Sequence, residues 1–218
     1  MSFRAVLFDL DGTLLDTIAD LSGSMNAVLS RAGFPVHPVD AYKYFVGDGL
    51  KQLVIRALPE ESRDAETVRR IHEAMRAEYE LHSHDRTRPY DGIPEMLSDL
   101  RRMEIPLAVL SNKPHAATLD VISHYFGDGV FRLVSGAKPD VPVKPDPQGA
   151  LAVVREFGIP AGDFLYLGDT NTDMKTAIGA GMFPVGALWG FRTREELLGS
   201  GAKTVVAHPS EVPPLIRR

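Results

Sequence analysis

The sequence has no cysteine, so disulfide bonds, thiolate nucleophiles and cysteine metal ligands are excluded for its 218 residues. It also has no dense block of Lys and Arg, and its formal net charge is −5. A weakly acidic chain without a basic patch is unsuited to nucleic acid or to an anionic membrane surface. No apolar run reaches the roughly 18 residues of a membrane-spanning helix, and the first residues show no signal-peptide pattern. We therefore expect a cytoplasmic protein with no nucleic-acid partner and no membrane partner.

The composition is that of an ordinary globular protein, with 44% hydrophobic and 24% charged residues. The length suits one large domain, or a core with a smaller insertion. Nothing in the sequence selects an oligomeric state, and both a monomer and a homodimer are compatible with it.

The first informative segment is an apolar run, Ala5–Phe8, with two aspartates close behind it. The run predicts a buried strand of a parallel sheet. Asp9 and Asp11 stand where this strand should end, and Gly12 permits a tight turn after them. Carboxylates are costly to bury unless they are paired or bind a metal. Because ligands bind at the carboxyl ends of the strands in open α/β sheets, this segment predicts a functional site.

Strands alternate with helices along the chain, except in one long stretch. Strands are predicted at 5–8, 106–110, 131–134, 164–167, 184–188 and 204–206, and helices at 17–32, 40–45, 50–58, 65–81, 93–100, 116–125, 147–157 and 172–180. The alternation predicts an α/β fold with a Rossmann-like parallel sheet. Residues 16–85 are predicted to be helical only. We therefore expect a core of residues 1–15 and 86–218, interrupted by an inserted all-helical domain of residues 16–85.

Polar residues of complementary kinds follow each of the first four predicted core strands. They are Asp9 and Asp11 after the first strand, Ser111 and Asn112 after the second, Lys144 after the third, and Asp169 and Asp173 after the fourth. Since the carboxyl ends of parallel strands meet at one edge of the sheet, we expect these side chains to converge there. Four carboxylates would repel one another unless they held a hard divalent cation. Mg²⁺ is the common choice beside a phosphate group, so we expect Mg²⁺ as cofactor.

This set of residues suits phosphoryl transfer, which needs mainly positioning and charge neutralisation. Asp9 is the expected nucleophile, because it ends the strand and is the more rigidly held of the first two aspartates. Asp11 would protonate the leaving oxygen and later accept a proton from water. Asp9, Asp11 and Asp169 are assigned to the metal site, together with Asp173, which would either bind the ion or orient the groups around it.

The remaining site residues are assigned to the phosphate group. Lys144 would supply a positive charge, and Ser111 and Asn112 would supply neutral hydrogen-bond donors. Gly12 and Thr13, in the turn after the first strand, are also assigned to substrate binding.

These residues also resemble the four motifs of the haloacid dehalogenase-like superfamily. The segment from Asp9 to Leu14 is similar to the first motif, Ser111 to the second and Lys144 to the third. Gly168 and Asp169, with Asp173, are similar to the fourth motif. The resemblance spans nearly the whole chain. It implies a Mg²⁺-dependent phosphatase that acts through an aspartyl-phosphate.

Single residues discriminate among the activities of that superfamily. Haloacid dehalogenases lack the second aspartate, and phosphonatases replace it with a small residue, whereas this chain has Asp11. β-Phosphoglucomutases carry a histidine twelve residues after the nucleophile, where this chain has Leu21. The resemblance therefore favours a hydrolase.

The helical insertion resembles the C1-type cap of the same superfamily. Its Gly47, Gly49 and Lys51 are similar to a loop of phosphoglycolate phosphatases, and they could receive the carboxylate of 2-phosphoglycolate. We therefore expect a small phosphorylated metabolite as the partner, with 2-phosphoglycolate as the leading candidate. A pyrophosphatase, a sugar-phosphate phosphatase and a non-catalytic protein that binds a phosphorylated ligand remain alternatives.

Overall fold

The structure, a computed structural model, describes residues 3–216, and the chain divides into two compact units. One unit extends to Leu15 and resumes at Pro89, and the other is Asp16–Arg88. Residues 1–2 and 217–218, the outermost residues of the predicted core, lie outside the described residues.

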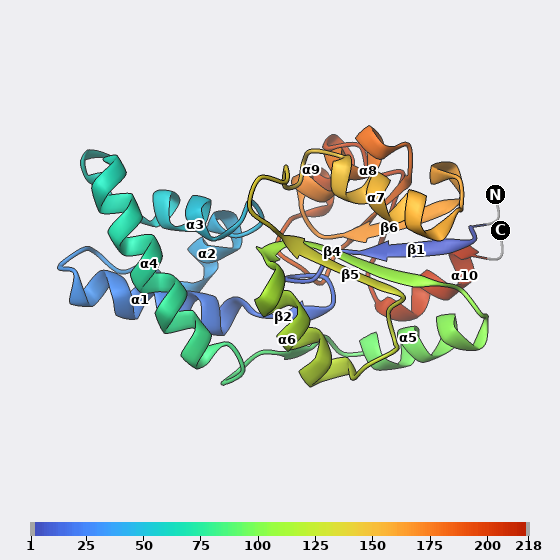
Figure 1. Cartoon of the computed structure of the whole chain (residues 1–218), viewed down its shortest axis with the longest axis horizontal. Helices are drawn as coiled ribbons and strands as arrows, with labels where there is room; N and C mark the ends of the chain where they lie inside the picture. Colours follow the sequence, from blue (N-terminus) through green and yellow to red (C-terminus); the bar gives the residue numbers. More distant parts are fainter. Residues whose placement is uncertain (1–2, 217–218) are drawn as a thin grey trace. The chain divides into compact units, whose positions relative to one another are not determined.

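The first unit contains a parallel sheet, which within residues 3–216 has six strands in the order β5-β4-β1-β6-β7-β8 (Figure 1). The strands are β1 (Ala5–Phe8), β4 (Leu107–Pro114), β5 (Leu133–Ala137), β6 (Phe164–Gly168), β7 (Phe183–Ala187) and β8 (Thr204–Val206). Every residue of β1 is fully buried, as expected for an apolar strand covered on both faces. The predicted α/β fold with a Rossmann-like parallel sheet is confirmed.

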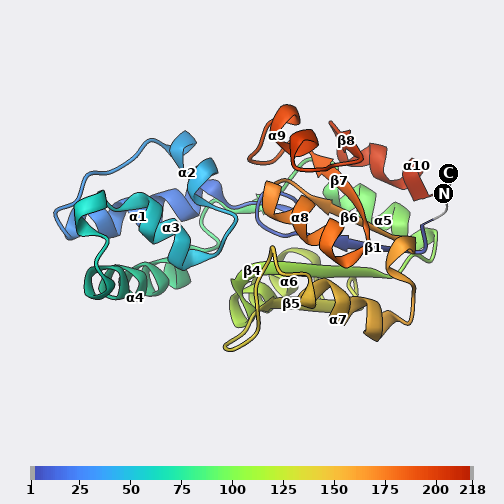
Figure 2. The same ribbon diagram turned by 90° about the horizontal axis from the view of Figure 1, so that it is seen from above.

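Helices cover both faces of this sheet (Figures 1 and 2). On one face lie α5 (Ile93–Arg102), α6 (His115–Phe126) and α10 (Val212–Ile216); on the other lie α7 (Gln148–Phe157) and α8 (Asn171–Ala180), and α9 (Arg194–Gly199) packs beside α8. Alternate side chains of β1 serve the two layers, because Val6 and Phe8 pack into the first apolar cluster and Ala5 and Leu7 into the second. Two 3₁₀ helices, η2 (Ala161–Asp163) and η3 (Pro209–Glu211), complete this unit.

The order of the strands explains where a site forms. From β1 the chain passes to β4 and β5 on one side and then returns to β6, on the opposite side of β1. The direction of winding therefore reverses at β1. In open parallel sheets, the crevice outside the carboxyl ends of the strands at such a point is where ligands bind.

Several strand boundaries differ from those predicted, most of all in β4 and β5. Strand β4 continues to Pro114 instead of ending at Leu110, because its pairing with β5 resumes at Pro114 after an irregularity. Strand β5 is Leu133–Ala137 instead of residues 131–134, because its pairing with β4 starts at Leu133 and continues to Ala137. Helices α9 and α10 were not predicted, because they are too short to show a clear helical periodicity.

The second unit is built from helices. They are α1 (Ile18–Arg31), α2 (Val39–Phe45), α3 (Leu50–Ala57) and α4 (Ala65–His82), with the 3₁₀ helix η1 (Glu60–Ser62) between the last two. Helix α4 packs on α1 and α3, and the predicted apolar faces of α1 and α4 are buried. Two short paired strands, β2 (Leu15–Asp16) and β3 (Arg88–Pro89), contain the points where the chain changes unit. No helix in residues 3–216 is long and apolar enough to cross a membrane.

A buried carboxylate in the second unit fastens the returning chain to α1. Asp20 lies in the first turn of α1 and is 4% exposed. Its Oδ2 accepts hydrogen bonds from the backbone N–H of Arg86 at 3.0 Å and from the N–H and Oγ1 of Thr87, both at 2.8 Å. Three donors on one buried carboxylate offset much of its desolvation cost.

Replacing this carboxylate should destabilise the protein. In Asp20→Ala, three donors lose their acceptor at a buried position, so we expect the free energy of unfolding to fall by about 2–4 kcal/mol. Urea unfolding followed by circular dichroism measures this loss. Asp40→Ala, at an exposed position of α2, is the matched control and should change stability by about 0.5 kcal/mol or less. Equal losses in the two variants would contradict the prediction.

Candidate active site

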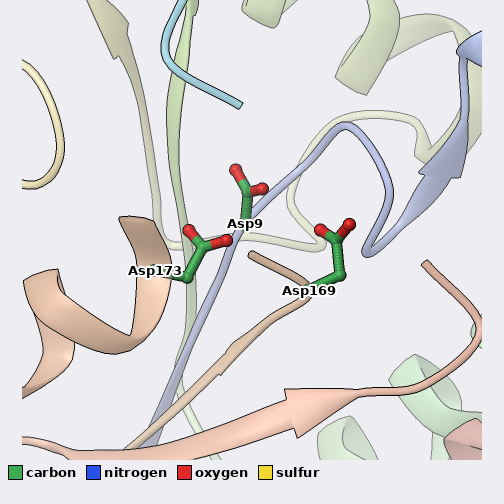
Figure 3. A group of neighbouring side chains, drawn as sticks. All are labelled: Asp9, Asp169 and Asp173. Atoms are coloured by element: carbon green, nitrogen blue, oxygen red, sulfur yellow. The ribbon is translucent and has the colours of Figure 1, made fainter. Parts of the chain in front are cut away.

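Three buried aspartates converge at the carboxyl edge of the sheet (Figure 3). Asp9 directly follows β1, Asp169 directly follows β6, and Asp173 lies in the first turn of α8. Each offers a carboxylate oxygen within 4.8 Å of the oxygens of the other two. Figure 3 shows that the three side chains come from separate segments and project into the same region. The strand order therefore brings Asp9 together with two aspartates that lie 160 or more positions later in the sequence.

A buried lysine neutralises part of this charge. The Nζ of Lys144 donates to Oδ1 of Asp9 at 2.5 Å and to Oδ1 of Asp173 at 2.7 Å. Burial alone would lower the pKa of Lys144, but the carboxylates of Asp173 and Asp9 raise that pKa well above its ordinary value. Lys144 is therefore an ammonium cation. Burial and the carboxylate of Asp173 raise the pKa of Asp9, and Lys144 opposes this rise.

The oxygens of Asp173 are occupied by protein donors. Oδ1 accepts from Lys144 and, at 3.3 Å, from the hydroxyl of Tyr166. Oδ2 accepts from the N–H of Thr170 at 3.1 Å and from its Oγ1 at 2.6 Å. The first of these bonds, together with the N–H of Asp173 donating to Oγ1 of Thr170, forms the capping box of α8. Of the two roles predicted for Asp173, this arrangement favours the one of orienting the groups around a metal ion.

Asp169 is held by donors from two different loops. Oγ1 of Thr13 donates to Oδ1 at 2.8 Å, and the backbone N–H of Phe191 donates to Oδ2 at 2.8 Å. The indole Nε1 of Trp189 donates to the carbonyl of Thr13 at 2.9 Å, so the two loops also hold each other. The hydroxyl of Thr13, which we assigned to substrate binding, thus serves to orient Asp169. Burial and the carboxylate of Asp173 raise the pKa of Asp169 from 3.8 to about 7.

Two glycines permit this close packing around Asp169. A Cβ at Gly190 would lie 2.3 Å from the Cβ of Asp169 and 2.4 Å from the carbonyl oxygen of Gly12. A Cβ at Gly12, where φ is +93°, would lie 2.3 Å from Oδ2 of Asp169. Only glycine fits at either position. Our sequence prediction did not assign Trp189, Gly190 or Phe191 to the site, although a glycine between two aromatic residues after a core strand is a usable signal.

Asp11 is paired with a lysine that the sequence prediction did not assign to the site. The Nζ of Lys113 lies 3.2 Å from Oδ1 and 3.5 Å from Oδ2 of Asp11. The Lys113 side chain is 3% exposed and that of Asp11 is 15% exposed. The backbone N–H of Lys113 donates to Oγ of Ser111 at 3.1 Å, which brings the serine of the second motif into the same group.

Asn112 positions the loop that carries Lys144. Its Nδ2 donates to the carbonyl of Lys144, and the N–H of Lys144 donates to its Oδ1, both at 2.9 Å. This reciprocal pair uses both ends of the Asn112 amide. The contact between Asn112 and a phosphate group stays a prediction, as does the one at Gly12, whose N–H donates to the carbonyl of Leu15 at 2.9 Å.

The three residues that we predicted to receive the substrate carboxylate belong to the second, helical unit. Gly47 and Gly49 both have positive φ, and Gly49 precedes the first residue of α3, in which Lys51 is exposed. Arg56 holds this loop, because it donates to the carbonyl of Phe45 at 3.1 Å and pairs with Asp48. The roles assigned to Gly47, Gly49 and Lys51 stay predictions.

The donor set fits a divalent metal ion. Asp9, Asp169 and Asp173 provide only hard oxygen atoms, they are buried, and their negative charge exceeds the single charge of Lys144. Asp9 and Asp169 could hold such an ion, with Asp173 as their orienting neighbour. Together with Asp11, this group would provide the predicted carboxylate nucleophile and carboxyl proton donor.

Comparisons with known proteins agree with the resemblance to the haloacid dehalogenase-like superfamily. Residues 6–187 match the model of the haloacid dehalogenase-like hydrolase family. The phosphoglycolate phosphatase of Pseudomonas putida is 31% identical over 191 residues, covering 86% of this chain and 70% of that protein. That of Neisseria gonorrhoeae is 31% identical over 192 residues, covering 86% of this chain and 81% of that protein. A crystal structure from Lactobacillus delbrueckii subsp. bulgaricus has a TM-score of 0.93 and 29% identity, covering 100% of this chain and 99% of that chain.

The raised pKa of Asp169 predicts how stability depends on pH without metal. Between about pH 4 and pH 7 the native state retains a proton on Asp169 that the unfolded chain has released. The free energy of unfolding contributed by this group therefore falls as the pH rises through that range. A divalent ion binds the ionised carboxylate and should reverse the loss.

Asp169→Asn tests this dependence, because asparagine has no proton to release in this range. In EDTA, we expect the wild-type protein to lose melting temperature relative to Asp169→Asn as the pH rises from 4 to 7. Adding Mg²⁺ at pH 7.5 should raise the melting temperature of the wild-type protein and leave that of the variant almost unchanged. Parallel pH profiles in EDTA would contradict the shifted pKa, and equal responses to Mg²⁺ would contradict the metal site.

Proposed function

Because this chain is a phosphatase of the haloacid dehalogenase-like hydrolase family, we propose that it hydrolyses a small phosphorylated metabolite through a phosphoryl group carried on Asp9. One observation carries this proposal. The Asp9 carboxylate directly follows β1, with Lys144 at one of its oxygens and two further buried carboxylates beside it. Among residues 3–216, no donor contacts the other oxygen, Oδ2 of Asp9, which is therefore available for a metal ion or for phosphorus.

In the first half-reaction, an oxygen of Asp9 attacks the phosphorus atom of the ester. A bond forms between that oxygen and phosphorus, and the bond between phosphorus and the leaving oxygen breaks. Asp11 gives its proton to the leaving oxygen, so the alcohol departs neutral. The ammonium group of Lys144 offsets the negative charge that accumulates beside Asp9.

In the second half-reaction, water hydrolyses the phosphoryl group on Asp9. Asp11, now a carboxylate, accepts a proton from the water as the water oxygen bonds to phosphorus. The bond between phosphorus and the Asp9 oxygen then breaks, which releases inorganic phosphate and restores both aspartates to their starting protonation states. The same side chain thus acts as acid and then as base.

We propose Mg²⁺ as the metal ion. Asp9 and Asp169 would hold it, and Asp173 and Thr13 would keep these ligands oriented. When bound, the ion would neutralise the carboxylate charge that otherwise repels an anionic substrate.

2-Phosphoglycolate is the substrate that we propose first. Support comes from relatives of about 30% identity that are named phosphoglycolate phosphatases and from the loop containing Gly47 and Gly49. Lys51 would receive the substrate carboxylate, since it provides an exposed cation in the first turn of α3.

Asp9→Asn tests the covalent mechanism. Asparagine cannot attack phosphorus as a carboxylate does, so we expect kcat to fall by at least about a thousandfold. The measurement is phosphate release from phosphoglycolate, pyrophosphate, sugar phosphates and nucleotides, with Mg²⁺ and with EDTA. Acid quenching of the wild-type reaction, followed by mass spectrometry, should recover a phosphoryl group on Asp9.

Asp91→Asn makes the same chemical change at an exposed position and should retain wild-type turnover. A loss of less than about tenfold in Asp9→Asn would exclude Asp9 as the nucleophile. A preference for pyrophosphate or a sugar phosphate would replace the proposed substrate and leave the mechanism intact. Binding of phosphorylated compounds without any turnover would favour a non-catalytic protein.

Lys51→Met tests how the carboxylate is recognised. We expect KM for 2-phosphoglycolate to rise by about fivefold, because one exposed ion pair to a ligand contributes on the order of 1 kcal/mol. KM for ethyl phosphate, which has no carboxylate, should stay within about twofold. Equal changes for the two substrates would show that Lys51 does not recognise the carboxylate.

A further inference from the structure

Lys113 is a buried cation that has no role in the two half-reactions described above. It lies near the end of β4, the strand that pairs with β1, and its side chain is 3% exposed. Its backbone is held at both ends, because its N–H donates to Oγ of Ser111 at 3.1 Å and its carbonyl accepts from Oγ1 of Thr118 at 3.2 Å. The ammonium group thus extends from a fixed point of the sheet to the two oxygens of Asp11.

Asp11 needs such support, because it lies beyond the end of its strand. Its backbone forms an isolated bridge with Leu15, but it is not part of the parallel sheet. A side chain in a turn does not have a fixed direction by itself. Transfer of a proton requires the acid to lie within about 2.6–3.2 Å of the leaving oxygen. A hydrogen bond donated by a rigidly held lysine supplies that direction, and it becomes an ion pair once the proton has left.

We propose that Lys113 is a positioning residue for proton transfer by Asp11: it holds the carboxyl group toward the leaving oxygen and stabilises the carboxylate that remains after the proton has left. This inference rests on the proposed function, since it assigns Lys113 to the step in which the leaving oxygen is protonated. Lys144 and Lys113 then have separate tasks. Lys144 serves the nucleophile Asp9, and Lys113 serves the acid Asp11.

The leaving group of the substrate distinguishes this role from a structural one. A nitrophenolate departs without a proton, whereas an alkoxide needs one. Loss of a residue that acts through Asp11 should therefore slow the cleavage of alkyl esters and hardly change the cleavage of nitrophenyl esters. A residue that only binds the phosphate group or stabilises the fold would affect both kinds of ester equally.

The test measures kcat/KM of Lys113→Met with ethyl phosphate and with 4-nitrophenyl phosphate, at saturating Mg²⁺. This parameter covers the steps up to departure of the leaving group. We expect a loss of about a hundredfold with ethyl phosphate, within the range of general acid catalysis, and of less than about threefold with 4-nitrophenyl phosphate. Lys203→Met, at an exposed position before β8, should match the wild-type protein with both esters.

A second comparison places the effect on Asp11. Adding Lys113→Met to Asp11→Asn should change kcat/KM for ethyl phosphate by less than about threefold, because the group through which Lys113 acts has already been altered. This double variant leaves neither charge of the pair unpartnered, so it should fold even if Lys113→Met alone does not. An undiminished loss in the double variant, or an equal loss with both esters, would overturn the inference. The proposed function fails separately, when Asp9→Asn retains turnover.

Discussion

The cost of gathering carboxylates in a buried space governs the arrangement of the first unit. Asp9, Asp169 and Asp173 lie within 4.8 Å of one another with exposures of 5% or less. Burial and mutual repulsion raise the pKa values of Asp9 and Asp169. Such a cluster persists only if donors and cations compensate it, and Lys144 is the strongest of these because it bridges two of the three.

The neighbouring loops serve the same cluster. Thr13 and the N–H of Phe191 hold Asp169 from two sides, and the capping box of α8 holds Asp173. Asn112 fixes the backbone of Lys144 from the neighbouring strand β4. Each of these hydrogen bonds orients a charged group, and each lies away from solvent. Hydrogen bonds within the protein thus orient the charged groups of the site, which suits electrostatic catalysis of phosphoryl transfer.

The two buried lysines pair with different carboxylates, which favours separate roles for them. One lysine lies beside the expected nucleophile and another beside the expected acid, and they come from the loop after β5 and from β4. On the proposed mechanism, we expect substitutions of the two lysines to alter the two functions independently. Neither lysine is exposed, and the carboxylate partners of each lysine offset the cost of burying its ammonium group.

Most of the fold was predictable from local patterns. The apolar run Ala5–Phe8, the helical periodicity of residues 17–32 and 65–81, and the alternation of strands with helices are local properties, and the structure confirms them. The convergence of Asp9 and Asp169 followed from one general rule about the carboxyl edge of parallel sheets. The end of β4 was predicted wrongly, because its last residues are extended by pairing with β5 rather than by their own propensity.

The sequence by itself determined the kinds of group at the site: carboxylates, lysines and hydroxyls at the ends of core strands, and glycine at position 12. Only the tertiary structure decided which of these groups form hydrogen bonds or ion pairs with one another. It assigned Thr13 to Asp169, Asn112 to the backbone of Lys144, and Lys113 to Asp11. Two of these three pairs join residues more than 100 positions apart, and all three depend on distances of about 3 Å. Residue patterns along a chain define which strand ends come together, but packing in three dimensions sets hydrogen-bond partners at that scale.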